Sequence, residues 1–411
     1  MRRPLIVAGI LSTALLTARF VFPLVALSDP AGGVLPTGAL LRFPTLNLIF
    51  APLFDLWDGV TLLSMGRLNS FLIGAIVLGA AWSIGRSLVG RRLDWRRATG
   101  HLALFTLLLG LFVVTGMRWQ RPMAHLAGVA DSTWWIADLH SHTTVSHDVQ
   151  GVLQDYFDLD ASRAWHARGG YSLFFVTDHN RIDGWSGARV GDPSGGPVVC
   201  PGEELSLWRA HIVLLGNVDS VPRSEYADSI PGILRLLGES ESRWGALTLA
   251  SIPEYDENHF GELPLWVIAG IDGFEISNAA PKANRQSKAH VDSVVKIAKF
   301  SGRWVAGVTD QHGMGGTPQA WTLVPREAPG AVDRGPCEEV LSTLRTKGFG
   351  ATQVIERHRL RPDSPWPYWT TVVAVVWEGW RSAQLLQVAS WLGWIWGVAL
   401  FFVYRARKAT V

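Results

Sequence analysis

Long apolar runs lie at both ends of the 411-residue chain, and shorter alternating runs lie between them. A helix needs about 20 consecutive apolar residues to cross a bilayer. The stretch Leu40–Leu63 is also largely apolar, but Asp55 and Asp58 interrupt it. The sequence therefore leaves three positions open for it: along the membrane surface, re-entering the membrane, or crossing it. The N-terminal region 1–125 is therefore predicted to hold three or four membrane helices, and residues 366–411 a C-terminal anchor. The predicted spans are Leu5–Leu27, Leu68–Val89, Leu102–Met117 and Leu385–Tyr404.

Basic residues flank these runs unevenly and indicate an orientation. Loops rich in Arg and Lys stay on the cytoplasmic side of a membrane. We therefore predict a multi-pass protein of the cell membrane whose central region is extracytoplasmic. A further crossing at Tyr368–Trp380 would leave that region in the cytoplasm, which is the alternative. The basic residues are Arg86, Arg91, Arg92, Arg96 and Arg97 between the second and third runs, and Arg405, Arg407 and Lys408 after the last.

The central region, residues 131–361, alternates strand-like and helix-like runs. This alternation implies an α/β domain with a largely parallel sheet covered by helices, either open or closed into a barrel. The predicted strands are Trp134–Asp138, Tyr171–Thr177, Pro197–Cys200, His211–Leu215, Ala246–Ala250, Ile271–Ile276 and Trp304–Val308. The predicted helices are Gln154–Ala167, Ile230–Leu237, Asn284–Lys299 and Cys337–Lys347.

Composition adds three points to this picture. The chain has 37 basic and 35 acidic residues, so no basic face for nucleic acid is expected. Of its 20 Trp residues, a cluster lies between Trp366 and Trp396, as is typical of a membrane–water interface. Cys200 and Cys337 are the two cysteines, and we expect two free thiols, although one bridge is possible in an oxidising compartment.

The densest group of polar residues follows the first predicted strand, in Asp138-Leu-His-Ser-His-Thr-Thr-Val-Ser-His-Asp148. His140 and His142 are two positions apart, so they project to the same side of an extended chain. Neutral imidazoles at this spacing can bind one divalent metal ion or two adjacent ones. His147 and Asp148 follow on a loop that can fold back over the same point. The sequence therefore predicts a metal site whose remaining ligands come from later strands.

Polar groups also follow the later strands, at the ends where parallel α/β folds build active sites. Asp178 and His179 are neighbours and face opposite ways, so we assign His179 as a ligand and Asp178 to orienting it or a bound water. For the same reason only one of Glu203 and Glu204 faces the site. Each group taken alone has a plainer reading as a turn, a helix cap or a buried histidine. The joint pattern favours metal binding, with His211, Asp310 and His312 as the further candidates.

Four motifs together resemble the polymerase-and-histidinol-phosphatase (PHP) family. They are Asp138-Leu-His-Ser-His-Thr, Thr-Asp-His-Asn180, Gly-Glu-Glu204 and Thr309-Asp-Gln-His312, and they extend over the central region. The resemblance implies a distorted seven-stranded β/α barrel and two or three divalent ions, commonly zinc, manganese or iron. It also implies that Glu204 bridges two ions, while the choice between His147 and Asp148 stays open. The implied ligands are His140, His142, His147, His179, Glu204, His211, Asp310 and His312.

One position departs from the family pattern. The fifth strand is usually followed by a His-Pro whose histidine binds metal, and here the matching residues are Ile252 and Pro253. Isoleucine cannot bind a metal ion, so we expect two bound ions rather than three. Glu254 or His259 is the possible substitute ligand downstream.

The expected function is a membrane-anchored metal-dependent hydrolase, foremost a phosphoesterase acting on an extracytoplasmic small-molecule or envelope-derived substrate. Bound ions lower the pKa of water and stabilise developing negative charge. Asp178, Glu204 and Asp310 are the predicted catalytic residues, and Asn278 and Arg285 are candidates for substrate binding. The alternatives are a non-catalytic binding or sensor module, and a hydrolase of carboxyl or carbamate esters or amides.

Overall fold

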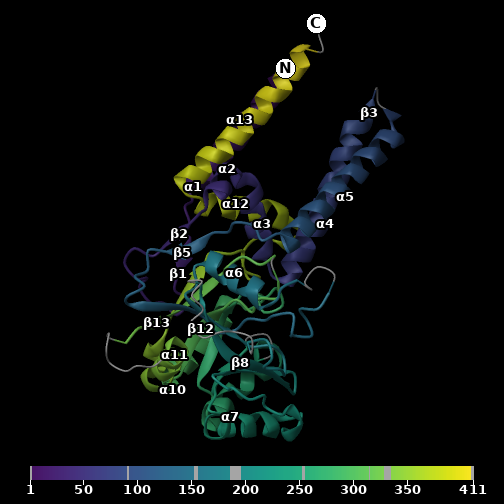
Figure 1. Cartoon of the computed structure of the whole chain (residues 1–411). Helices are drawn as coiled ribbons and strands as arrows, with labels where there is room; N and C mark the ends of the chain where they lie inside the picture. The colour runs from purple at the N-terminus through teal and green to yellow at the C-terminus, as the bar shows by residue number, and fades with distance from the viewer. Residues whose placement is uncertain are drawn as a thin grey trace.

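A computed structural model describes residues 2–89, 92–151, 156–185, 196–251, 255–313, 315–327 and 335–408. Among these residues, four helices are long and apolar enough to cross a membrane. They project from one side of the central domain, with both chain ends and the β3–β4 turn at their far ends (Figure 1). The four helices are α1 (Arg2–Phe20), α4 (Met65–Ser87), α5 (Trp95–Arg118) and α13 (Leu385–Lys408), and the turn is formed by β3 (Leu88–Val89) and β4 (Arg92–Leu93).

The interrupted stretch at 40–63 forms no long helix. Strand β2 (Leu40–Arg42) pairs antiparallel with β5 (His125–Ala127), and it is followed by α2 (Thr45–Ile49) and α3 (Ala51–Thr61). With 11 residues, α3 is too short to cross a bilayer. The same holds for α12 (Thr371–Ser382), which has 12 residues and follows the one-turn η5 (Tyr368–Thr370). Both short helices pack between the long helices and the domain (Figure 1).

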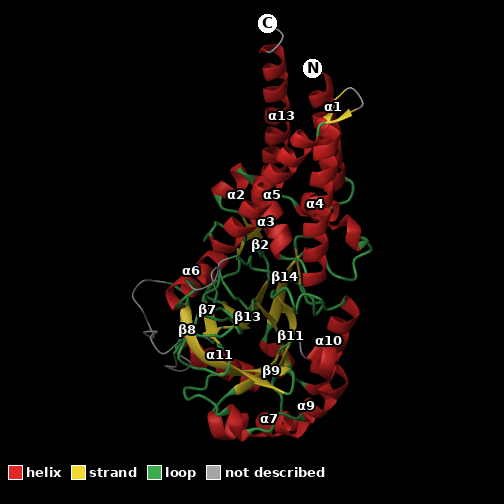
Figure 2. Ribbon diagram, turned by 90° about the vertical axis from the view of Figure 1, so that its right-hand side faces the viewer, coloured by secondary structure: helices red, strands yellow, loops and turns green. Residues whose placement is uncertain are grey.

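The central domain is built on one curled sheet of ten strands, in the order β1-β14-β13-β6-β7-β8-β9-β10-β11-β12 (Figure 2). All seven predicted strands are present, so the α/β prediction is confirmed, but the predicted number of strands is wrong. Three strands extend the sheet beyond β6, each pairing antiparallel with its neighbour. The strands are β1 (Leu27–Ser28), β6 (Trp134–Asp138), β7 (Leu173–Val176), β8 (Val198–Leu207), β9 (Ala210–Leu215), β10 (Leu247–Ala250), β11 (Gly273–Asn278), β12 (Trp304–Val308), β13 (Ala320–Pro325) and β14 (Gln353–Arg357).

The sheet is mixed rather than largely parallel. Strands β6, β7 and β8 are parallel, as are β10, β11 and β12, but β9 runs antiparallel to both β8 and β10. The reason is local: Trp208 and Arg209 adopt positive φ angles and reverse the chain between β8 and β9 as a tight hairpin. The prediction of a largely parallel sheet is therefore wrong at these two strands.

The carboxyl ends of β6 and β12 meet, so the curl brings the β12 edge of the sheet back to the interior strand β6. Ser141 and Gln311 form a parallel bridge. The amide of Asp310 donates to the carbonyl oxygen of His140 at 2.9 Å, and the amide of His142 donates to the carbonyl oxygen of Gln311 at 3.1 Å. Because these bonds join the loops that carry the histidines, they fix the two motifs beside each other.

Helices cover the outer faces of the sheet (Figure 2). Their starts are set by capping side chains: Asp158, Ser229 and Ser287 each accept a hydrogen bond from a backbone amide of the first turn. The amphipathic helices bury their apolar faces against the strands. They are α6 (Leu159–Gly169), α7 (Ile230–Trp244), α9 (Leu263–Ala269), α10 (Lys288–Ser301) and α11 (Pro336–Lys347), with short turns at η1 (Arg223–Glu225), η2 (Tyr255–His259), η3 (Phe260–Glu262) and η4 (Gly348–Ala351).

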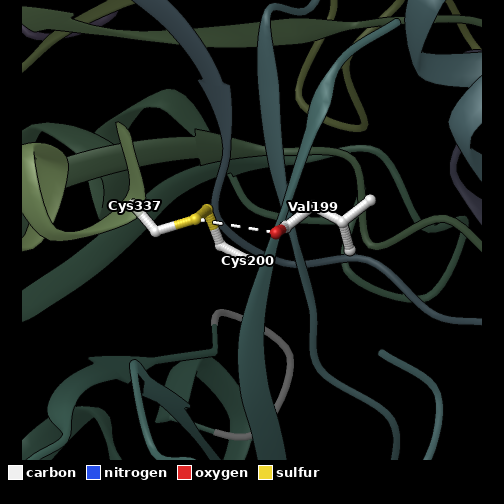
Figure 3. Close-up of a disulfide and its surroundings, with 3 residues drawn as sticks. All are labelled: Val199, Cys200 and Cys337. Atoms are coloured by element: carbon white, nitrogen blue, oxygen red, sulfur yellow. Dashed lines mark hydrogen bonds between the residues drawn. A yellow bond between two sulfur atoms is a disulfide. The ribbon is translucent and has the colours of Figure 1, made fainter. Parts of the chain in front are cut away.

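A disulfide joins Cys200 on β8 to Cys337 on α11, with an S–S distance of 2.04 Å (Figure 3). The expectation of two free thiols is therefore wrong. The residues lie 137 positions apart, so their proximity depends on α11 packing against the sheet and is not visible in the sequence. The bond ties a covering helix to the strand that carries Glu204.

Candidate metal centre

The candidate ligands converge at one end of the curled sheet. Parallel strands β6, β7 and β12 end at this edge, so the loops that follow them meet there. The antiparallel β8–β9 pair contributes side chains from within its strands. In its register Glu204 lies opposite Val213, and His211 lies opposite Ser206. The strands supply His140 and His142 after β6, His179 after β7, Glu204 on β8, His211 on β9, and Asp310 and His312 after β12.

Among the described residues, three groups of donor atoms are suited to a metal ion, and in each group the atoms lie within 4.8 Å of one another. The groups overlap, because His142 belongs to two of them and His179 to two. Nitrogen and carboxylate oxygen donors at this density are typical of zinc, manganese or iron sites. The groups are His140, His142 and Asp310; His179, Glu204 and His211; and His142, Asp148, His179 and His312.

Glu204 lies at the centre of these groups and is 1% exposed. Its Oε2 lies 3.2 Å from Nε2 of both His140 and His142, and 3.3 Å from Nε2 of His179. Its Oε1 lies 2.9 Å from Nδ1 of His211. Neither oxygen makes a hydrogen bond of regular geometry among the described residues. Burial of a carboxylate without such bonds is costly, and bound cations would remove that cost.

The imidazoles face one another across the same point. Nε2 of His140 and Nε2 of His142 are 3.1 Å apart, and Asp310 Oδ1 lies 3.0 Å from the latter. Asp148 Oδ2 lies 3.1 Å from His179 Nε2 and 2.8 Å from His312 Nε2. Lone pairs aimed at a common position are the arrangement that a divalent ion requires. The donor set therefore fits the metal ions that the sequence predicts.

Buried and partly buried groups contact the far atoms of the candidate ligands and hold them in this orientation. Glu275 Oε1 lies 2.6 Å from His140 Nδ1, and Ser206 Oγ lies 3.3 Å from His179 Nδ1. Asn278 donates to Asp310 Oδ2 at 3.2 Å. Partners of this kind fix the ring orientation of a ligand and raise its basicity.

Burial disfavours every charge in this centre, and opposite charges nearby act against it. Burial lowers the pKa of His142, but the nearby carboxylates of Asp310 and Glu204 raise it overall to about 10. Burial raises the pKa of Glu204, yet the surrounding imidazoles, His179 first, hold it well below its usual range. The centre thus holds positive charge near its carboxylates, and cations and protons compete for the same nitrogen atoms.

The neighbouring acids Glu203 and Glu204 point to opposite sides of β8, as the alternation of side chains along a strand requires. Glu204 faces the donor groups, whereas Glu203 is buried on the other side and accepts from Ser220 Oγ at 2.9 Å and the amide of Val221 at 2.8 Å. Asp178 accepts from the amide and the hydroxyl of Thr143, both at 2.7 Å. It therefore fixes the loop that carries His142, and the expectation that it orients His179 or a bound water stays a prediction.

Neither of the two predicted substrate-binding residues lines the cavity beside the donor groups. Asn278 is buried and donates to Glu275 Oε2 at 2.9 Å as well as to Asp310, so it positions a candidate ligand. Arg285 forms an ion pair with Glu257 and does not line the cavity beside the donor groups. A basic residue that follows a strand in the sequence is too weak a signal for substrate binding. The direction of its side chain depends on the geometry of the loop and helix that carry it.

The two alternatives after the first motif both lie near His179, and both are exposed. Asp148 contributes an oxygen atom to a donor group, whereas the ring of His147 lies 5.0 Å from the ring of His179 and belongs to none of the three groups. Ile252 and Glu254 lie outside the described residues. His259 is described, but its Nδ1 lies 2.8 Å from Glu262 and its Nε2 2.8 Å from the carbonyl oxygen of Trp208, away from the donor groups.

Sequence reasoning missed two buried groups. Glu275 interrupts the apolar run of β11. A charged residue between Phe274 and Ile276 was the feature of the sequence that could have indicated a buried functional group. His166 on α6 lies 3.0 Å from Asp138 Oδ2, and Asp138 also accepts from the amide of Thr309 at 3.0 Å. This network joins the starts of the first and last motifs.

The chain matches no family model and no curated protein. Among solved structures, it resembles a candidate metal-dependent phosphoesterase from Bifidobacterium adolescentis at 14% identity, with a TM-score of 0.34, covering 44% of this chain and 88% of that one. It also resembles PsfC from Pseudomonas syringae at 17% identity and a TM-score of 0.37, covering 59% and 96%. A third likeness is to an amidohydrolase from Chromobacterium violaceum at 17% and 0.31, covering 54% and 97%. Likenesses of this size carry no weight for function.

Proposed function

We propose that this protein is a membrane-anchored, metal-dependent hydrolase of phosphoesters whose catalytic domain lies outside the cytoplasm. The observation that carries the proposal is the overlap of the three donor groups around the buried carboxylate of Glu204. A site for structural metal alone would be closed by its protein ligands. Here Asp148, His211 and His312 remain partly exposed on one side, which leaves that side open to substrate.

His140, His142 and Asp310 would hold one ion, and His179, Glu204 and His211 would hold another. Adjacent divalent ions supply an activated water and charge stabilisation for in-line displacement at phosphorus. Around them the chain has its own roles. Glu204 connects the two groups, Glu275 orients His140, and the buried loops after β6 and β12 exclude bulk water from the inner side.

Three features support an extracytoplasmic domain. The basic residues Arg86, Arg92, Arg405 and Arg407 are carried at the helix ends farthest from the domain, and Arg91 lies outside the described residues. Such residues favour the cytoplasmic side. An even number of spans returns both termini to that side. The disulfide Cys200–Cys337 also suits an oxidising compartment.

Metal analysis and hydrolysis by the purified full chain test the proposal. Protein loaded with Mn²⁺ or Zn²⁺ is expected to cleave generic phosphomonoesters or phosphodiesters. Replacing His140 and His142 together by Ala should abolish both metal binding and activity. His290→Ala, on the exposed face of α10, is the matched control and should retain both.

Full activity of the double variant would contradict the metal-hydrolase proposal. If the protein cleaves carboxyl or carbamate esters and no phosphoester, its substrates are these esters and the phosphoesterase proposal is wrong. Tight metal binding without cleavage of any ester would leave a binding or sensor module as the better description.

A further inference from the structure

One cavity joins the candidate metal centre to the domain ends of two potential membrane spans. Its volume is about 490 Å³, within the range of about 300–1,000 Å³ that is usual for ligand pockets. One part of its wall is formed by His179, Glu204, His211, Asp310 and His312. The other part is apolar and comes from α3, α4 and α5, including Trp57, Leu68, Phe71, Leu72, Phe112 and Val113.

The apolar wall follows α4 and α5 away from the domain. Met65 to Leu72 form the first two turns of α4, a rise of about 10 Å at 1.5 Å per residue. Phe112 and Val113 lie in the last two turns of α5, which runs beside α4 in the opposite direction (Figure 1). The wall is fixed in place, because Trp57 Nε1 donates to the carbonyl oxygen of Phe112 at 3.0 Å. Gly116 admits this close approach, since a Cβ there would lie 3.0 Å from the same nitrogen.

Aromatic side chains mark this level as a membrane–water interface. Trp369 is 81% exposed, Tyr368 43% and Trp119 39%. Trp119 directly follows α5, and the guanidinium of Arg67 on α4 lies 4.6 Å from the ring centre of Tyr368. Exposed Trp and Tyr gather at the depth of lipid head groups. The metal centre then faces the head-group side, and the apolar wall begins at the depth of the acyl chains.

A small polar ester gains nothing from such a wall, because contact with apolar side chains would cost it hydrogen bonds to water. A hydrocarbon chain, by contrast, gains binding free energy with each CH₂ group that such a wall removes from water. Lys282 is exposed, lines the same cavity, and could meet a negatively charged head group. The cavity therefore fits a molecule with a polar end and an apolar end.

We propose that the substrate is a membrane lipid whose phosphoester lies at the metal centre while its hydrocarbon chain lies between α4 and α5. This inference rests on the proposed function and names its substrate class. In the reaction, the oxygen of water bonds to phosphorus and the ester bond from phosphorus to the leaving oxygen breaks. One proton of the water ends on that leaving oxygen, and the other ends on the phosphate product or in solvent.

The test compares two adjacent positions on α4 in the full chain. Leu72→Trp places a larger side chain in the cavity, whereas Ile73→Trp alters a residue that is 64% exposed and does not line the cavity. With Mn²⁺ present, each protein is assayed on vesicles of phosphatidylglycerol and phosphatidylethanolamine and on soluble bis(p-nitrophenyl) phosphate. Leu72→Trp should lower the ratio of lipid to soluble-ester cleavage at least about tenfold, the loss that about 1.4 kcal/mol of binding produces. Ile73→Trp should leave the ratio unchanged.

A second readout does not depend on activity. Native mass spectrometry of the metal-free protein should find one retained phospholipid in the natural chain and in Ile73→Trp, and none in Leu72→Trp. Equal retention in all three proteins, with an unchanged ratio of cleavage rates, would overturn the lipid inference and leave the phosphoesterase proposal standing. Absence of all hydrolysis together with selective loss of lipid in Leu72→Trp would instead overturn the catalytic proposal and support the lipid site.

Discussion

At the scale of single residues, Glu275 offers the sharpest test of how the centre is held. Its carboxylate is fully buried, and its contact of 2.6 Å with His140 Nδ1 fixes which nitrogen of that ring faces the donor groups. In Glu275→Gln the shape is kept but the negative charge is lost, so His140 becomes a weaker base. Loss of such a partner typically lowers metal affinity about 10–100-fold. Titration against a fluorescent chelator should show this loss for Glu275→Gln.

The matched control is Glu239→Gln, a partly exposed residue that pairs with Arg235 on α7. This variant should bind metal like the natural chain. Unchanged metal affinity in Glu275→Gln would show that Glu275 is needed for packing alone.

The same residues show how much of the site the sequence could predict. The spacing of His140 and His142 and the alternation of Glu203 and Glu204 are local properties, and local geometry decides them. Glu275 acts on a residue 135 positions away, and no short pattern records such a contact. The choice between His147 and Asp148 likewise depends on how a loop folds back over His179.

At the scale of elements, the disulfide between β8 and α11 closes a loop of 137 residues and limits the freedom of the unfolded chain. Removing a native disulfide typically costs about 2–5 kcal/mol of stability. Changing Cys200 and Cys337 together to Ser should therefore lower the free energy of unfolding by that order, as measured by urea denaturation of the purified chain. Reductant should destabilise the natural chain to a similar extent and leave the double variant unaffected. A natural chain that is insensitive to reductant would contradict the expected contribution.

The strands show where sequence patterns succeed and where tertiary contacts decide. Both β6 and β12 are short apolar runs with polar residues after them, and both were predicted with the bounds observed. Strand β8 continues past Cys200 through Pro-Gly-Glu-Glu, a sequence typical of a turn. It stays a strand because Ser220 and Val221 donate hydrogen bonds to Glu203 and because Glu204 faces the imidazoles of the candidate metal centre. The strand β14 was missed because its polar residues find partners on distant elements, as Arg357 does with Asp58.

At the scale of the whole molecule, Asp58 on α3 connects the membrane region to the domain. Its carboxylate is 1% exposed and lies 3.2 Å from Arg121 Nη2 and 2.9 Å from Arg357 Nη1. Burial raises the pKa of Asp58, but Arg357 and Arg121 hold it overall below its ordinary value of 3.8. Because the pKa of Asp58 is lower in the folded chain than in the unfolded chain, its ionised form stabilises the fold. This stabilisation is complete at pH values above 3.8 and is lost as the pH falls through the pKa of the folded state.

Asp58→Asn should therefore destabilise the protein most at neutral pH, by about 3–5 kcal/mol, because it leaves the buried guanidinium of Arg121 and the partly buried guanidinium of Arg357 without their counter-charge. The difference from the natural chain should narrow below about pH 4. Thermal unfolding in detergent across pH 3–8 measures this, with the exposed Asp131→Asn as control. A difference that is constant with pH would contradict the electrostatic explanation.

The orientation of the whole chain decides which substrates the centre can meet. Helices α4 and α5 carry the paired strands β3 and β4 at their far ends, while the last turn of α5 reaches the cavity beside the candidate metal centre. If the turn is cytoplasmic, a secreted-phosphatase reporter fused after Arg118 should be active and one fused at Leu93 silent. A green fluorescent protein, which fluoresces only when folded in the cytoplasm, should give the reverse result at the same two sites. The opposite pattern for both reporters would place the domain in the cytoplasm, and the lipid reached between α4 and α5 would then belong to the inner leaflet.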